Sequence, residues 1–105
     1  MAQFSIYRNR SPRTKSAFPL LLDVQSDLLD ALATRVVIPM SRAGSLAKNP
    51  LQQLTPIVEF ESETYVLLTP QLAAIAHGEL GAAIGSLAQQ RGTILAAVDF
   101  LLTGI

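Results

Sequence analysis

Side chains that could carry out chemistry are few in this sequence, and they stand far apart. The single histidine, His77, is followed by a glycine and has no serine or cysteine nucleophile pattern near it. That context is typical of a surface histidine in a turn. Folding could still bring His77, an arginine and a glutamate into one cleft for acid–base cleavage of RNA, so a ribonuclease stays the alternative. We expect a protein that binds a target rather than an enzyme.

The carboxylates form two groups with ordinary structural explanations. Asp23, Asp27 and Asp30 could gather in space, but their spacing matches no calcium loop, and aspartate commonly occupies turns and caps. A second series alternates along one face of an expected strand, as on a solvated edge: Glu59, Glu61 and Glu63. With no cysteine and no glycine-rich phosphate loop, the sequence predicts no metal site and no cofactor.

Composition limits the class of protein. Half of the 105 residues are hydrophobic and 15% are charged, so we expect this small protein to hide apolar surface in an oligomer. Eight basic residues balance eight acidic ones, which argues against a general nucleic-acid binder. No apolar run approaches the ~20 residues of a membrane-spanning helix, and residues 1–10 lack a signal-peptide pattern. We expect a single cytoplasmic domain over residues 1–105.

One segment is unevenly charged. Arg8, Arg10, Arg13 and Lys15 fall within a stretch that contains no acid. Pro12 and the polar residues around it predict a loop. Two interpretations stay open, a solvated loop and a surface for an acidic partner.

Alternating and β-branched segments predict an antiparallel sheet. The expected strands are Gln3–Arg8, Phe18–Val24, Arg35–Met40, Ile57–Phe60 and Tyr65–Leu68, the last two as a hairpin. The first should be half-buried, with Phe4 and Ile6 on one face. Pro39 lacks a backbone donor and should face an edge or a bulge. Ser41–Pro50 is expected to be a loop. Short strands followed by one helix favour a small barrel or sheet with the helix packed on one side.

Two adjacent leucines, Leu28 and Leu29, follow the second expected strand and are enclosed by acids and a serine. Neighbouring side chains in an extended segment point to opposite sides, so these two cannot both enter the core. The pattern leaves open whether they are exposed for a partner or pack locally.

The last twenty residues predict one helix, Ser86–Ile105. Ser86 and Gln89 have the spacing of a capping box, and Gly104 after Thr103 is typical of a helix stop. At 100° per residue, the expected core face comprises Ile84, Leu87, Ala88, Ile94, Leu95, Val98, Leu101, Leu102 and Ile105.

The opposite face of this helix is also nearly uncharged. It holds Gln89, Thr93, Ala96, Ala97 and Phe100. A helix that is apolar nearly all round is usually covered on more than one side. We therefore expect a two-fold homodimer with these helices near the axis.

Four segments of the sequence resemble the CcdB toxin family. They are QFSIY at Gln3–Tyr7, LLLDVQSDLLD at Leu20–Asp30, RVVIPM at Arg35–Met40 and AAVDFLLTGI at Ala96–Ile105. The likeness covers nearly the whole chain with little gapping. The motif VQSD, followed by two apolar residues and an aspartate, is specific when it occurs together with the Gly-Ile pair.

The resemblance implies a mainly β fold with a C-terminal α-helix, an SH3-like antiparallel barrel with a small accessory sheet, in a homodimer. It implies a toxin of a type II toxin–antitoxin system that binds the DNA gyrase A subunit and traps the gyrase–DNA cleavage complex. A CcdA-like antitoxin would neutralise it, and the two would repress their own operon, with operator DNA bound only through the antitoxin complex. It implies no cofactor, no metal and no membrane.

The resemblance also implies site residues. The gyrase-binding set would be Asp23, Ser26, Leu28, Leu29, Asp99, Leu102, Thr103, Gly104 and Ile105, where the first two could serve as structural supports. The antitoxin-binding set would be Arg8, Arg10, Arg13 and Arg42. The dimer interface would include Ala96, Phe100 and Thr103.

Two positions depart from the family pattern. Thr103 stands where an aromatic is typical, so a cation–π contact with a target arginine, worth ~0.5–2 kcal/mol, is missing. Asp99 stands where an uncharged amide is typical, and its carboxylate could pair with a basic target group or weaken binding. Two alternatives follow: an endoribonuclease of the MazF/Kid toxin type, which shares the fold, and an inactive homologue that keeps only antitoxin binding.

Overall fold

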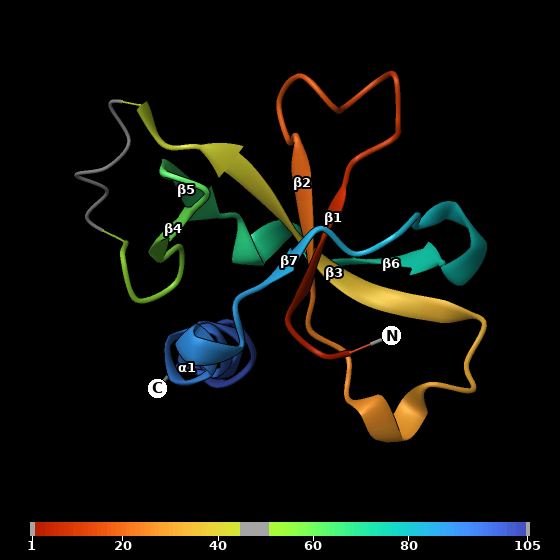
Figure 1. The fold of residues 1–105 in the computed structure, drawn as a ribbon. Helices are drawn as coiled ribbons and strands as arrows, with labels where there is room; N and C mark the ends of the chain where they lie inside the picture. The colour runs from red at the N-terminus through yellow and green to blue at the C-terminus, as the bar shows by residue number, and fades with distance from the viewer. Residues whose placement is uncertain (1, 45–50, 105) are drawn as a thin grey trace.

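The computed structural model describes residues 2–44 and 51–104, and Figure 1 shows how the elements are arranged. The strands are β1 (Ser5–Arg8), β2 (Leu20–Asp23), β3 (Thr34–Arg42), β4 (Ile57–Phe60), β5 (Glu63–Leu67), β6 (Ala73–Ala76) and β7 (Gly85–Ser86). The helix is α1 (Arg91–Thr103). Short 3-10 turns are η1 (Asp27–Leu29), η3 (Thr69–Gln71), η4 (His77–Glu79) and η5 (Ala88–Gln90).

The strands form one antiparallel sheet in the order β4-β5-β3-β2-β1-β7, and β6 pairs with β3 outside this path. The sheet curls into a half-barrel, with α1 lying near β7 and the β4–β5 hairpin (Figure 1). The predicted mainly β fold with a C-terminal helix is confirmed. The small accessory part is β6, which is continuous with the main sheet through β3.

The long strand β3 changes its partner along one edge. Its first half pairs with β6 and its last residues pair with β5, while β2 occupies the other edge. Pro39 lies between the two partner strands, and its carbonyl accepts the Leu68 N–H at 2.9 Å. Because the N–H and C=O of one strand residue point to the same edge, the donor that Pro39 lacks would fall at this break. That placement agrees with the edge position expected for Pro39.

Both faces of the sheet's centre are buried. The main core, between the curled sheet and α1, includes Phe4, Ile6, Leu22, Ile38, Met40, Leu67 and Ile94. A second cluster on the other side of the sheet consists of Tyr7, Leu21, Val37 and Leu80, with Ile75 packed against it. The expectation of a half-buried first strand is therefore wrong, because residues of β6 and of the segment after η4 cover its second face.

The β4–β5 hairpin is tighter than predicted. β5 begins at Glu63, and Phe60 pairs with Glu63 across a two-residue turn. Glu61 and Ser62 in this turn both have positive φ, 51° and 67°, as a type I′ hairpin turn requires. Of the expected loop Ser41–Pro50, Ser41 and Arg42 instead extend β3, and residues 45–50 lie outside the described residues.

The predicted helix Ser86–Ile105 begins too early. Ser86 belongs to β7 and pairs with Ser5, and the Leu87 N–H donates to the Phe4 carbonyl at 2.8 Å. The Ser86 hydroxyl accepts from the Ala88 N–H at 3.0 Å, so its hydrogen bond lies at the start of the short turn η5 rather than at the start of α1. The predicted stop is right, since Gly104 has φ 72° and its N–H donates to the Phe100 carbonyl.

The predicted core face of the helix needs correction at several positions. Ile94 and Ala97 are the fully buried side chains of α1, with Leu95 and Val98 partly buried against the core. Ala97 was expected on the opposite face, whereas Ala88 and Leu102 were expected inside and are exposed. The predicted stripe was too broad: the buried residues follow a narrower spacing of three and four, and η5 breaks the helical phase before Arg91.

Candidate functional site

The turn η1 carries the adjacent leucines and settles their position. The side chains of Leu28 and Leu29 are 95% and 49% exposed. The Ser26 hydroxyl accepts from the Leu28 N–H at 3.1 Å, and the Ser26 carbonyl accepts from the Leu29 N–H at 3.0 Å. Ser26 is therefore a cap that starts the turn, and both leucines face outward rather than into the core. Leu32, which follows in the loop to β3, is also 50% exposed.

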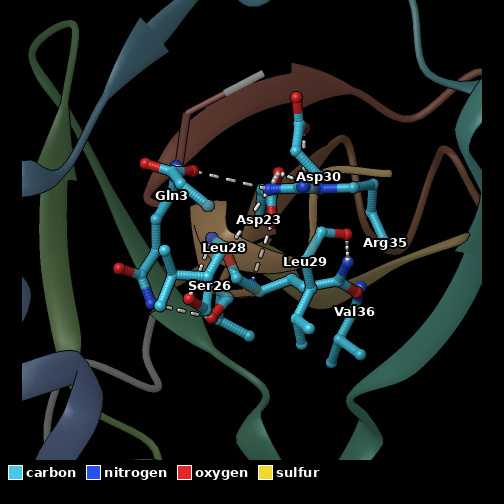
Figure 2. Close-up of polar contacts among 11 residues, drawn as sticks. Gln3, Asp23, Ser26, Leu28, Leu29, Asp30, Arg35 and Val36 are labelled. Carbon is cyan, nitrogen blue, oxygen red and sulfur yellow. Dashed lines mark hydrogen bonds and ion pairs between the residues drawn. The ribbon is translucent and has the colours of Figure 1, made fainter. Parts of the chain in front are cut away.

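A buried ion pair lies beneath this turn. Arg35, at the start of β3, and Asp23, at the end of β2, are both 0% exposed. The Arg35 Nε and Nη2 atoms lie 2.8 and 2.7 Å from Asp23 Oδ2, and Arg35 Nη1 lies 3.0 Å from Asp30 Oδ1 (Figure 2). Asp27 Oδ1 is 3.9 Å from Arg35 Nη2. The three aspartates do gather, and the cation among them is the protein's own guanidinium, whose several donors suit more than one carboxylate.

The buried side chain of Gln25 links the turn to the sheet. Its Oε1 accepts from the Val36 N–H of β3 at 3.1 Å, and its Nε2 donates to the Leu29 carbonyl at 3.1 Å. Its backbone N–H donates to Asp23 Oδ1 at 3.0 Å, and its carbonyl accepts from Arg35 Nη2 at 3.3 Å. Gln25 therefore contacts the ion pair, the strand and the leucine turn together.

The N-terminal segment supports the same turn from another side. The Gln3 N–H donates to Asp27 Oδ1 at 2.7 Å, and its Nε2 donates to the Val24 carbonyl at 3.1 Å. Phe4 has a positive φ of 71°, an unfavourable conformation for a residue with a side chain. Its buried ring and its backbone hydrogen bonds hold it there, and the Arg91 guanidinium lies 5.7 Å from the ring centroid. The start of α1 is thus close to the segment that supports η1.

The charges of this site act on Tyr7. Burial raises the pKa of Tyr7, and the negative charge of Asp23 raises it further, while Arg35 opposes the rise. Tyr7 belongs to the second cluster of the sheet, so its pKa responds to the ion pair from the side opposite the main core.

The end of α1 carries the other predicted gyrase-binding residues. Leu102 is 72% exposed, and Asp99, Thr103 and Gly104 are exposed. The Thr103 hydroxyl donates to the Asp99 carbonyl at 2.7 Å, so it bonds within its own helix. Ile105 lies outside the described residues. Figure 1 shows η1 (orange, at the bottom) and α1 (blue, at the left) in separate parts of one chain.

The predicted antitoxin-binding residues lie on two segments. Arg8, Arg10 and Arg13 are exposed, in or after β1. Hydrogen bonds of Asn9 connect the two sides of their loop: its Nδ2 donates to Thr14 Oγ1 and to the Phe18 carbonyl. Arg42, at the end of β3, forms an exposed ion pair with Glu63 at 2.9 Å, of a kind that adds only about 0–1 kcal/mol.

Residues of the predicted dimer interface line a hollow beside α1. Its volume is about 370 Å³, and Thr93, Ala96 and Phe100 form its helical wall. Gln52 and Gln53 form the remaining lining. Ala96 and Thr103 are exposed and Phe100 is partly buried, so this part of the helix surface is open to a partner in a single chain.

Among the described residues, His77 does not line the cavity that brings an arginine and a glutamate together. Arg10 and Glu79 line a cavity of about 520 Å³ between the β1–β2 loop and η4. His77, in η4, is exposed and is not among the residues that line this cavity. In the described part of the chain, the arrangement therefore gives no support to acid–base catalysis by His77.

Sequence reasoning missed four residues that shape the leucine turn. Gln25 stood within the VQSD motif without a role, and Arg35 read as the first residue of a β-branched strand. Gln3 was expected only as the first residue of a strand, and Leu32 had no predicted role. A signal for Arg35 was present: it follows three aspartates within thirteen residues, and such a cation near the end of a hairpin is a natural partner for them.

In the described residues, no helix has both the length and the apolar composition that a membrane span requires.

Comparison with known proteins gives the family. The model of the CcdB protein family matches residues 3–104 of the 105-residue chain. The match includes β1, η1 and its supporting residues, and all of α1. The chain therefore belongs to the CcdB family of toxins of toxin–antitoxin systems.

Proposed function

We propose that this protein poisons DNA gyrase by binding its A subunit and trapping the gyrase–DNA cleavage complex. The observation that carries the proposal is the exposed leucine pair of η1, where Leu28 is 95% exposed on a capped and hydrogen-bonded turn. Burying one leucine side chain gains about 1.5–3 kcal/mol, and the fold leaves this gain for a partner. These leucines stand where the family has an apolar pair that faces gyrase.

The proposal also covers the toxin's mode of action, its assembly, its antitoxin and where it acts. The toxin acts by binding and not by catalysis, as a homodimer that brings two copies of α1 together. A CcdA-like antitoxin neutralises it, and the two repress their operon together. Because its target acts on DNA in the cytoplasm, the toxin works there. Arg8, Arg10, Arg13 and Arg42 would face the antitoxin, and Ala96, Phe100 and Thr103 would face the second copy.

A gyrase cleavage assay tests the proposal directly. The protein is incubated with purified bacterial gyrase, ATP and supercoiled DNA, and linear product is measured after detergent and protease treatment. We expect linear DNA from the wild type and little from the Leu28→Ala, Leu29→Ala double variant. Leu51→Ala is the matched control, because Leu51 is 57% exposed outside the proposed surface. Removal of Gly104 and Ile105 should abolish poisoning while the dimer persists.

A parallel assay separates the two toxin classes. The same protein is incubated with RNA alone, and the products are resolved by size. Intact RNA together with gyrase-dependent DNA breaks supports the proposal. Degraded RNA with unaffected gyrase would overturn it in favour of an endoribonuclease. Retained antitoxin binding without either activity would identify an inactive homologue.

A further inference from the structure

The exposed leucine turn contributes no residue to the buried core. None of the three residues of η1 is buried. A single 3-10 turn has few hydrogen bonds and weak geometry, so it does not persist without outside contacts. The polar groups that reach η1 from the sheet and from the residues beside it must therefore help to hold it in place.

We propose that Arg35 and Gln25 are positioning residues for gyrase binding, which hold η1 so that Leu28 and Leu29 are presented to the target. The inference rests on the proposed function above and adds the residues that make the surface competent. Neither side chain touches the target itself, since both are buried. Each acts through a group on η1 or directly after it.

Arg35 makes two kinds of contact, and each has its own structural role. Its Nε and Nη2 atoms bind Asp23, and this pair joins the ends of β2 and β3, which are already paired in the sheet. Its Nη1 atom instead reaches Asp30, the residue that ends η1, at 3.0 Å. The carboxyl group of Asp30 is half exposed. The inner contact neutralises the buried cation, and the outer contact fixes the end of the turn.

The side-chain amide of Gln25 provides a second connection, separate from the contact between Arg35 and Asp30. One end of its amide accepts from Val36 N–H in β3, and the other end donates to the Leu29 carbonyl. The backbone of the second leucine is thereby tied to the strand. Figure 2 shows Leu28 and Leu29 lying between Ser26 and Asp30, with Arg35 reaching toward Asp23 and Asp30.

Loss of these contacts would weaken binding because η1 would be less ordered in the free toxin. A turn that is ordered in the free toxin does not lose its conformational freedom when the complex forms, whereas a mobile turn does. We therefore expect variants without the outer contacts to bind gyrase about tenfold or more weakly, although the leucines are still present.

The test uses Asp30→Ala in the full-length toxin, because it removes the outer contact and leaves the buried Arg35–Asp23 pair in place. Asp30→Asn is the conservative variant, since its side-chain oxygen can still accept from Arg35. Gln25→Glu is the independent variant: it keeps an acceptor for Val36 but loses the donor to Leu29. Glu63→Ala is the matched control, because Glu63 has a half-exposed ion pair with Arg42 at a similar distance.

Two readouts are measured on each variant. Hydrogen exchange of the Leu29, Asp30 and Leu32 amides, which donate within or beside the turn, reports order in the free toxin. Equilibrium binding to purified gyrase A subunit reports affinity. For Asp30→Ala and Gln25→Glu we expect faster exchange at these amides, unchanged exchange in β2 and β3, and weaker binding. Asp30→Asn should lie closer to the wild type, and Glu63→Ala should match it.

Each other outcome overturns the inference. Weaker binding of Asp30→Ala with unchanged exchange would make Asp30 a direct contact with gyrase. Faster exchange with unchanged affinity would show that order in the turn does not matter for the target. If the wild type itself fails to bind gyrase, the proposed function fails and the positioning role falls with it, while the exchange data still show whether these side chains order the turn.

Discussion

Leu28 in η1 and Leu102 in α1 are the two most exposed leucines of the described chain, yet they are held in opposite ways. The end of α1 is stabilised locally, by helical backbone bonds and by Gly104 in a left-handed conformation. The turn η1 is stabilised from a distance, by the side chains of Gln25 and of Arg35 in β3 and by the Gln3 N–H of the N-terminal segment.

This difference predicts how each region responds to substitution. Helical backbone bonds form between residues four apart, so a change at the end of α1 should stay within its last turn. The contacts beneath η1 include two fully buried charges. Removing one of them leaves the other buried without its main partner, so the damage should extend to the whole fold.

The largest expected effect comes from Arg35→Ala. The substitution leaves the Asp23 carboxylate buried without its guanidinium, and breaking a buried pair in this way costs about 3–5 kcal/mol of unfolding free energy. Urea unfolding followed by circular dichroism measures the change. Arg42→Ala is the control, because its ion pair with Glu63 is exposed, and removing it should cost less than about 1 kcal/mol. Equal losses in the two variants would contradict a special role for the buried pair.

A second substitution pair compares the core and the exposed side of α1. Ile94 is 0% exposed and Leu102 is 72% exposed. Ile94→Ala should lower the unfolding free energy by about 2–5 kcal/mol, because it removes buried methyl groups and leaves a cavity. Leu102→Ala should leave stability within about 0.5 kcal/mol of the wild type. A large loss with Leu102→Ala at low protein concentration would show that this side chain is part of the core.

The strands could be predicted from the sequence because their signals are local. Ile57–Phe60 was placed with the observed bounds, and β2 and β3 were found within two residues at each end. β7 could not be found this way. Its two residues become a strand only because Ser86 pairs with Ser5, and nothing near Ser86 in the sequence indicates that pairing. The same pairing explains why the helix starts at Arg91 rather than at Ser86.

The site was predictable only in its outer layer. Motif resemblance pointed to Leu28, Leu29, Asp23 and Ser26, but the residue pattern left open whether the two leucines are exposed, and Asp23 is fully buried. The burial of Arg35 has no local signal, because its environment is built by aspartates from β2 and from the turn. Arginine is rarely fully buried unless it is paired, so a strand pattern alone would place it at the surface.

A smaller effect should separate Gly92, within α1, from Gly104, which follows its last residue. Gly104 has φ 72° with open space where a Cβ would lie, so Gly104→Ala should cost about 1 kcal/mol through backbone strain alone. Gly92 also has open space around it but has no positive φ, so Gly92→Ala should stabilise the helix by about 0.5–1 kcal/mol. Thermal unfolding of the two variants measures the opposite signs. A gain from Gly104→Ala would contradict the left-handed helix stop.

The smallest effect, a change in tyrosine ionisation, compares η1 with the β4–β5 hairpin. Burial raises the pKa of Tyr7 from 10.0, and Asp23 and Asp30 raise it further. Burial also raises the pKa of Tyr65, together with Glu63 and Glu61. Since the unfolded chain loses these protons near pH 10.0 and the folded chain holds them to higher pH, stability should fall as the pH rises above that value. Urea unfolding at a series of alkaline pH values should show a shallower fall for Tyr7→Phe.

The two tyrosines should also respond to different carboxylates. Asp30→Ala removes a negative charge that acts on Tyr7, so it should lower the pKa of Tyr7 and leave that of Tyr65 in place. Glu63→Ala should do the reverse. Ultraviolet titration of phenolate absorbance in single-tyrosine variants, with the other tyrosine replaced by phenylalanine, separates the two. Equal shifts of both tyrosines in the Asp30→Ala variant would mean that the charge beneath η1 also acts on the β4–β5 hairpin and is not confined to its side of the sheet.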